Sequence, residues 1–211
     1  MNTTAENNLT DMNKVGAAWQ TFMESYQNKK MEIEVDLRGI EDQKNALMNQ
    51  LADYNRRTED MRSMSERNPH QEAIISEGAN SLKSLTSDYD ARLNATEQVI
   101  DSLQDELHKQ TDAIIDDNRK TFQENTKAYT GHAGDAPDWA GFMQRHEEQQ
   151  TIYKIKRTQV TTALKEVQAL RKRWFDFRIE YYDVSQQVRT AIRPTAAAWL
   201  THWRQMNQPP N

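Results

Sequence analysis

The chain has 211 residues, of which 36% are hydrophobic and 28% charged, with 6 glycines, 5 prolines and no cysteine. So few turn-forming residues exclude a sandwich, a barrel or a wound α/β sheet, and the lack of cysteine excludes disulfides, thiolate metal sites and a cysteine nucleophile. The net charge of −5 disfavours a nucleic-acid-binding domain, which is usually basic overall.

The first predicted element is a helix over residues 12–66, after a polar segment over residues 1–11 that we expect to be flexible. Apolar or aromatic residues recur every seven positions at Met12, Trp19, Tyr26, Ile33, Ile40, Leu47, Tyr54 and Met61. A second series runs through Gly16, Met23, Lys30, Leu37, Lys44, Leu51 and Thr58. Together they form the a/d seam of a left-handed coiled coil, in which polar members such as Lys30 and Lys44 weaken packing but fix the register or the oligomer state.

The second predicted helix covers residues 69–129. Asn68 can cap it and Pro69 suits its first position, which predicts a tight chain reversal here; one kinked, continuous helix is the alternative. The seam is Ile75, Ala79, Leu82, Thr86, Tyr89, Leu93, Thr96, Ile100, Leu103, Leu107, Gln110 and Ile114. The pattern then predicts a shift of one residue, to Ile115, Phe122 and Tyr129.

The third predicted helix covers residues 137–193, between the glycine- and proline-containing stretch at 130–138 and Pro194. Its seam is Trp139, His146, Tyr153, Val160, Val167, Trp174, Tyr181 and Val188, with a partner series three residues further on. The predicted fold is therefore all-α: an elongated antiparallel three-helix coiled-coil bundle with helices of about 55–60 residues. A short amphipathic helix over 195–207 and a tail over 208–211 complete it.

The stretch RKRWFDFRIEYY, residues 171–182, combines four cations with five aromatic rings. Three of the rings belong to the seam. A second apolar stripe, Phe175, Ile179 and Tyr182, lies about a quarter-turn away, so this segment should contact more than one helix. We therefore predict that the second stripe lies in a partner or oligomer interface.

Basic residues gather on the third predicted helix, since residues 139–193 hold 11 basic and 6 acidic residues, whereas residues 1–138 hold 15 basic and 26 acidic residues. The candidates for an anionic-surface or salt-bridge patch are Lys154, Lys156, Arg157, Arg171, Lys172, Arg173 and Arg178. The favoured interpretation is a solvated face, or one paired with carboxylates of the acidic helices, such as the clusters Glu32, Glu34, Asp36 and Asp112, Asp116, Asp117. A phosphate or lipid surface is the alternative.

The C-terminal sequence TAAAWLTHWRQM places Trp199, Leu200, Trp203 and Met206 on one helical face. This face either folds back on the bundle or docks a partner, because exposed Trp is a typical interface anchor. Both interpretations stay open.

Catalytic and cofactor motifs are missing from the sequence. None of the five histidines stands near a nucleophile or paired carboxylate at a telling spacing, and there is no phosphate-binding loop. We therefore predict no enzyme activity, no cofactor and no metal. The start of the chain does not resemble a Sec signal peptide and no apolar stretch could span a bilayer, so we expect a cytoplasmic protein or a component of a soluble assembly.

The architecture is similar to that of the BAR domain, which also uses three long helices in about 200 residues, and to coiled-coil components of phage particles, secretion machines and cytoskeletal assemblies. We predict a non-enzymatic structural or scaffold protein that self-associates or bridges protein partners in a larger assembly, such as a virion, secretion or cytoskeletal complex. The partners would be proteins, with a homo-oligomer expected, and no nucleic acid. The alternative is a BAR-like dimer that binds or curves anionic membranes.

Overall fold

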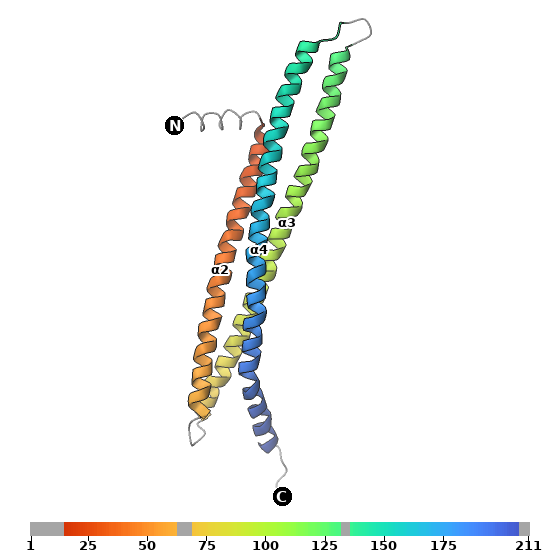
Figure 1. Cartoon of the computed structure of the whole chain (residues 1–211). Coiled ribbons are helices and arrows are strands. Elements are labelled where there is room, and N and C mark those ends of the chain that lie inside the picture. The colour runs from red at the N-terminus through yellow and green to blue at the C-terminus, as the bar shows by residue number, and fades with distance from the viewer. Residues whose placement is uncertain (1–14, 63–68, 132–135, 207–211) are drawn as a thin grey trace, which may run out of the picture. The chain divides into compact units, whose positions relative to one another are not determined.

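The computed structural model describes residues 15–62, 69–131 and 136–206, without the side chains of residue 62 and residues 194–206. These residues form three helices: α2 (Ala17–Arg62), α3 (Pro69–Thr130) and α4 (Trp139–Met206) (Figure 1). The predicted all-α fold with three long helices is confirmed. The predicted flexible segment 1–11 and tail 208–211 lie outside the described residues.

The helix ends follow from local backbone chemistry. Gly16 has a φ of 85°, in the left-handed region that glycine adopts easily, so α2 begins at Ala17 rather than at residue 12. Gly16 was predicted to belong to the seam, but it is exposed. The neighbouring Val15 is buried instead. Gly131, with a φ of 64°, ends α3 by donating its N–H to the carbonyl of Lys127. Asp138 caps α4 by accepting a hydrogen bond from the N–H of Gly141 at 2.9 Å.

Pro194 does not end the third helix. The predicted end at residue 193 and the separate helix over 195–207 are wrong, because α4 is one element of 68 residues that continues to Met206. A proline removes a single backbone donor and crowds one preceding carbonyl, so it can bend a helix without ending it. The run Ala196–Ala198 follows after Thr195, and alanine is the residue that favours helix most.

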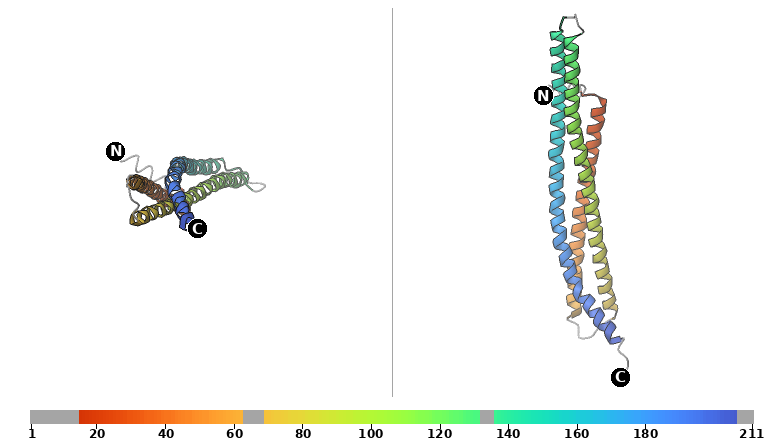
Figure 2. Two further views of the ribbon diagram at one scale, coloured as in Figure 1. Left: turned by 90° about the horizontal axis from the view of Figure 1, so that it is seen from below. Right: turned by 90° about the vertical axis from the view of Figure 1, so that its right-hand side faces the viewer.

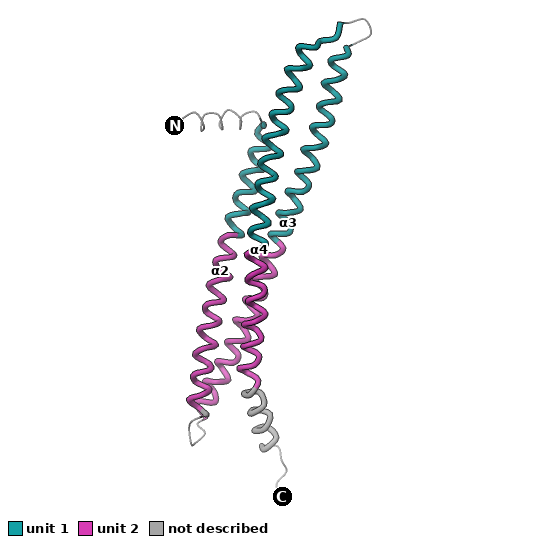
Figure 3. The backbone as a smooth tube through the Cα atoms, in the orientation of Figure 1, with its two compact units in different colours: residues 1–33, 99–171 teal, residues 34–98, 172–211 magenta. Residues whose placement is uncertain are grey.

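The chain forms two compact units, each built from parts of all three helices (Figure 3). Unit 1 contains residues 1–33 and 99–171, and unit 2 contains residues 34–98 and 172–211. The helices pair in the same directions in both units. The pairs are Lys29–Glu106, Trp19–Gln159 and Asn118–Gln149 in unit 1, and Gln50–Ser81, Lys44–Glu180 and Asp90–Arg178 in unit 2.

These pairs show that α3 is antiparallel to both α2 and α4. In unit 2, Gln50 pairs with Ser81 whereas Asp36, earlier in α2, pairs with Arg92, later in α3. The chain therefore reverses between α2 and α3, as predicted, and the kinked continuous helix is excluded. α4 is parallel to α2, with partners 136 to 140 residues apart in the chain.

The predicted heptad seams form the core. From α2, all the apolar members between Trp19 and Tyr54 in the main series are buried; α3 and α4 add buried residues at the same spacing. The largest fully buried side chains are Tyr26, Ile33, Leu37, Ile40, Leu47, Leu82, Tyr89, Leu93, Ile100, Leu103, Leu107 and Val160. Burial of these side chains is the main force that holds the helices together.

The end of the seam on α3 differs from the prediction. Ile114 is buried whereas Ile115 and Phe122 are exposed, and the next buried residue is the polar Asn125. In unit 1, α3 and α4 continue side by side beyond the first turn of α2, so only two helices pack there among the described residues (Figure 2). Asn125 is held by hydrogen bonds from its amide to the carbonyl of Phe142 and from Arg145 to its own oxygen. The side-chain amide of Gln149 likewise donates a hydrogen bond to the side-chain oxygen of Asn118.

Candidate interaction surface

The predicted second stripe on α4 lies at the protein surface. Phe175, Ile179 and Tyr182 are 54%, 54% and 61% exposed, and we call these three residues the α4 outer stripe. They are spaced four and three residues apart, so they follow one line along the helix. No described residue of the chain covers this line.

The neighbouring seam residues of α4 make the contacts with both other helices. Trp174 is buried and donates its indole N–H to the carbonyl of Leu93 on α3 at 2.9 Å. On the other side, the Lys44 ammonium of α2 lies 5.6 Å from the centre of the Phe177 ring. The predicted contact with two helices is therefore supplied by the seam alone, which leaves the α4 outer stripe uncovered.

Arg178 lies at the edge of this stripe. Its guanidinium is 5.4 Å from the centre of the Tyr182 ring and donates to a carboxylate oxygen of Asp90 on α3 at 2.5 Å. Desolvation by burial acts to lower the pKa of Arg178, but the hydrogen bond and the charge of Asp90 raise it overall. Arg178 therefore stays charged and fixed in position beside the stripe.

The predicted cations do not act as one free patch. Arg171 pairs with Asp101 and Arg178 with Asp90, whereas the acidic clusters suggested by the sequence are used differently: Asp36 pairs with Arg92, and Asp116 with Arg119 of its own helix. Other candidates contact rings of unit 1, Lys156 over Trp19 and Arg157 beside Tyr153. The exposed candidates are Lys154, Arg157, Lys172 and Arg173.

The C-terminal candidates Trp199, Leu200, Trp203 and Met206 belong to α4 by their backbone. Their side chains lie outside the described residues, so their role as a docking face stays a prediction.

An aromatic cluster that the sequence did not single out lies at the end of unit 1. Phe142 lies within 6.4 Å, centre to centre, of Phe122, Tyr129, Trp139 and His146. These residues were predicted to belong to the seams. Phe122 and Trp139 are exposed because α2 does not reach this end of unit 1. α2 begins after Gly16, which has a positive φ, and the heptad spacing of the sequence does not predict this start.

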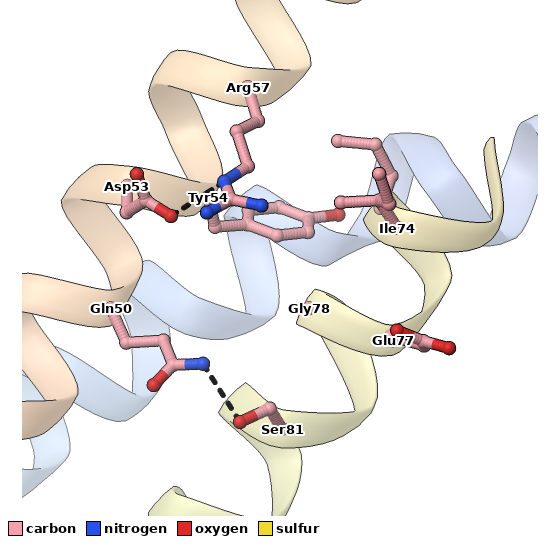
Figure 4. Close-up of a pocket in the computed structure, with 9 residues that line it drawn as sticks. Gln50, Asp53, Tyr54, Arg57, Ile74, Glu77, Gly78 and Ser81 are labelled. Carbon is pink, nitrogen blue, oxygen red and sulfur yellow. Dashed lines mark hydrogen bonds and ion pairs between the residues drawn. The ribbon is translucent and has the colours of Figure 1, made fainter. Parts of the chain in front are cut away.

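A small cavity of about 240 Å³ opens between α2 and α3 in unit 2 (Figure 4). Tyr54 and Gly78 line it, together with the Arg57–Asp53 pair and the hydrogen-bonded Gln50 and Ser81. The Glu77 side chain points away from Tyr54 (Figure 4). Asp53 is paired with Arg57 and Gln50 with Ser81, so these four polar side chains do not converge on a ligand in the cavity.

The described residues contain no group of three or more histidine or acidic side chains that could hold a metal ion. Among the same residues, no helix has a stretch that is both long and apolar enough to cross a lipid bilayer.

Comparison with known proteins gave no match: no family model fits the chain, and neither the curated proteins nor the solved structures contain one similar to it. The α4 outer stripe therefore has to be interpreted from its own chemistry.

Proposed function

We propose that this protein is a non-enzymatic structural component that self-associates or bridges protein partners within a larger assembly. The observation that carries the proposal is the α4 outer stripe. Single exposed apolar residues are common on protein surfaces, but two aromatic rings and an isoleucine in one line form a continuous apolar patch. Covering such a patch removes apolar area from water at about 25 cal/mol per Å², which favours association.

The composition of the patch also supports a protein partner. Interface centres are enriched in aromatic residues and arginine, and here Phe175 and Tyr182 flank an isoleucine while Arg178 lies against the Tyr182 ring. The rings lie on a helix that Trp174, about a quarter-turn away, fixes to α3 in the core. A rigid helix loses little conformational freedom when a partner binds.

The test compares two variants that place a charge at equally exposed apolar positions of unit 2. Ile179→Glu disrupts the α4 outer stripe, whereas Val35→Glu on α2 changes a residue that is 57% exposed and outside the stripe. We expect light scattering after size-exclusion chromatography at high protein concentration to show an oligomer for the wild type and Val35→Glu, and a shift toward monomer for Ile179→Glu. Circular dichroism of all three proteins controls for folding.

The bridging form of the proposal has its own readout. If the wild type is a monomer at every concentration and salt, the stripe has to bind a different protein. Binding of such a partner, once purified, must then be lost in Ile179→Glu and kept in Val35→Glu. If the wild type is a monomer and Ile179→Glu binds the partner as tightly as the wild type does, the proposal has no basis.

A further inference from the structure

We propose that the partner on the α4 outer stripe is a second copy of this chain, packed parallel and in the same register. This inference rests on the proposed function and names its partner. It follows from a second heptad pattern on α4 and from the charges on either side of it.

The α4 outer stripe continues into a short a/d seam that is separate from the buried one. Lys172, Phe175, Ile179, Tyr182 and Gln186 follow each other at spacings of three, four, three and four residues. Lys172, Ile179 and Gln186 then take the a positions and the two rings take d. Phe175, Ile179, Tyr182, Lys172 and Gln186 are all exposed. A seam of this kind packs against an identical helix.

Opposite charges border this seam on its two sides. Arg178 takes the g position and Asp183 the e position five residues later. The same helix repeats the arrangement one heptad earlier, in Arg171 and Asp176. The two edges of the seam are therefore basic and acidic, each with a period of seven.

This pattern selects a parallel dimer. In parallel helices a g residue faces the e residue of the next heptad on the partner, so Arg178 meets Asp183 of the second copy, and each interface contains the pair twice. In antiparallel helices g faces g and e faces e, so arginine would meet arginine and aspartate would meet aspartate. Like charges in such positions suppress that arrangement.

The groups concerned are available for these contacts. Asp176 and Asp183 are exposed on α4, and Asp183 accepts a hydrogen bond from the Gln187 amide on its own helix at 3.0 Å. Arg178 uses one terminal nitrogen for Asp90, and a guanidinium carries five donors in a planar fork. Arg178 can therefore hold Asp90 within its own chain and Asp183 of the second copy at the same time.

The size of the seam determines the strength of the dimer. Three side chains that are a little over half exposed offer roughly 300 Å² per copy, whereas a stable interface buries about 800 Å² per partner. The isolated dimer should therefore dissociate readily on dilution. Within an assembly that holds many copies together, the high local concentration of the chain makes the same weak contact form more often.

Single cysteines test the orientation, because the chain contains none of its own. Lys172→Cys and Gln186→Cys each lie one heptad from Ile179 and leave the α4 outer stripe intact. In a parallel dimer each position meets its own copy, within reach of a disulfide, so each variant cross-links with itself under mild oxidation. In an antiparallel dimer centred on Ile179, identical positions lie about 21 Å apart, and only a mixture of the two variants cross-links. Asp42→Cys on α2 controls for random collision.

The outcomes separate this inference from the proposed function. Self-cross-linking of both variants, well above the Asp42→Cys level, supports the parallel dimer. Cross-linking only in the mixture overturns it, as does an oligomer that light scattering detects but neither cysteine captures; both results leave the proposed function standing. A monomer at all concentrations overturns the inference and leaves only the bridging form of the function.

A charge variant tests the register. Asp183→Lys would place a lysine against Arg178 of the second copy, and we expect the dissociation constant to rise about tenfold or more. Asp88→Lys, an exposed aspartate on α3 in the same unit, changes the net charge equally and should leave the constant within about twofold. Equal effects of the two variants would overturn the proposed pairing.

Discussion

Lys30 of α2 forms an ion pair with Glu166 of α4, with 2.9 Å between the ammonium nitrogen and a carboxylate oxygen. In the other unit, Lys44 pairs with Glu180 at 2.8 Å. Both pairs join residues 136 apart, so the two lysines that interrupt the apolar seam each have an acidic partner at the same offset.

These two pairs favour one register of α4 along α2. The lysines are two heptads apart and so are the glutamates, and the residue halfway between the glutamates is Arg173. A slip of one heptad in either direction would place one lysine opposite Arg173. This arrangement supports the prediction that the polar seam residues fix the register, at the expense of apolar packing.

Glu166 predicts a dependence of stability on pH. A hydrogen bond from the Tyr26 hydroxyl, opposed by partial burial and helped by Lys30, holds the pKa of Glu166 below its ordinary value of 4.5. A lowered pKa stabilises the folded state at pH values above the ordinary value, and this stabilisation is lost as the pH falls through the folded pKa. We expect Glu166→Gln to reduce the free energy of unfolding by about 1 kcal/mol at pH 7, and by much less near pH 3.

Urea denaturation of the wild type and Glu166→Gln at both pH values measures this difference. Glu41→Gln, an exposed glutamate on α2, is the control and should change little at either pH. A Glu166→Gln effect that is equally large at pH 3 would contradict the assignment.

Two tryptophans of α4 should respond very differently to truncation. Trp174 is 7% exposed and bonded to the Leu93 carbonyl, whereas Trp139 is 59% exposed and stacks on Phe142. Trp174→Ala leaves a cavity and should reduce the free energy of unfolding by about 3–5 kcal/mol. Trp139→Ala should cost about 1 kcal/mol or less. Chemical denaturation followed by circular dichroism measures both, and similar losses would show that the seam assignment is wrong.

Two glycines inside helices of unit 2 should differ in sign when changed to alanine. The atoms nearest to a Cβ on Gly39 would belong to the Arg92 guanidinium, whose partly exposed pair with Asp36 is worth at most about 1 kcal/mol. Alanine favours a helix over glycine by about 1 kcal/mol, so Gly39→Ala should be neutral or stabilising.

Gly78→Ala should destabilise instead, because its Cβ would lie 3.1 Å from the ring of Tyr54, which is buried and cannot swing away. Thermal denaturation of the two variants compares them directly. A gain in melting temperature for Gly78→Ala as large as that for Gly39→Ala would show that Tyr54 is free to move.

Anionic vesicles should not retain this protein more strongly than neutral ones. Arg171 and Arg178, two of the candidate cations, are already paired with Asp101 and Asp90. Co-sedimentation with vesicles of increasing phosphatidylserine content tests this expectation. Retention that grows with the anionic lipid and disappears in Lys172→Glu with Arg173→Glu would favour the membrane-binding alternative instead.

The seam residues could be predicted because one turn of a helix takes 3.6 residues, so buried side chains recur three or four positions apart. The buried side chains of α2 and α3 between Ile33 and Leu107 follow this spacing. The spacing of apolar residues in the sequence also indicated the α4 outer stripe, but only the structure shows that no described residue covers it. Gly16 and Pro194 were misjudged because both residues tolerate more than one backbone conformation, and neighbouring residues decide which one forms.

The ion pairs could not be predicted one by one. The acidic helices offer several carboxylates as partners for Arg178. Its pairing with Asp90 depends on the offset between α3 and α4 along their axes. That offset is set by the turn between them and by how the seams interdigitate, which are properties of the packed helices rather than of any local stretch.

The division into units also determines what happens when the chain is cut. Each unit draws on a stretch of every helix, so the polypeptide passes from one unit to the other three times before it ends. A fragment that carries one unit complete has to span most of the chain, residues 1–171 for unit 1 or residues 34–211 for unit 2. A cut at any position between residues 34 and 171 divides both units at once, so a protease that acts there should abolish the resistance of both together.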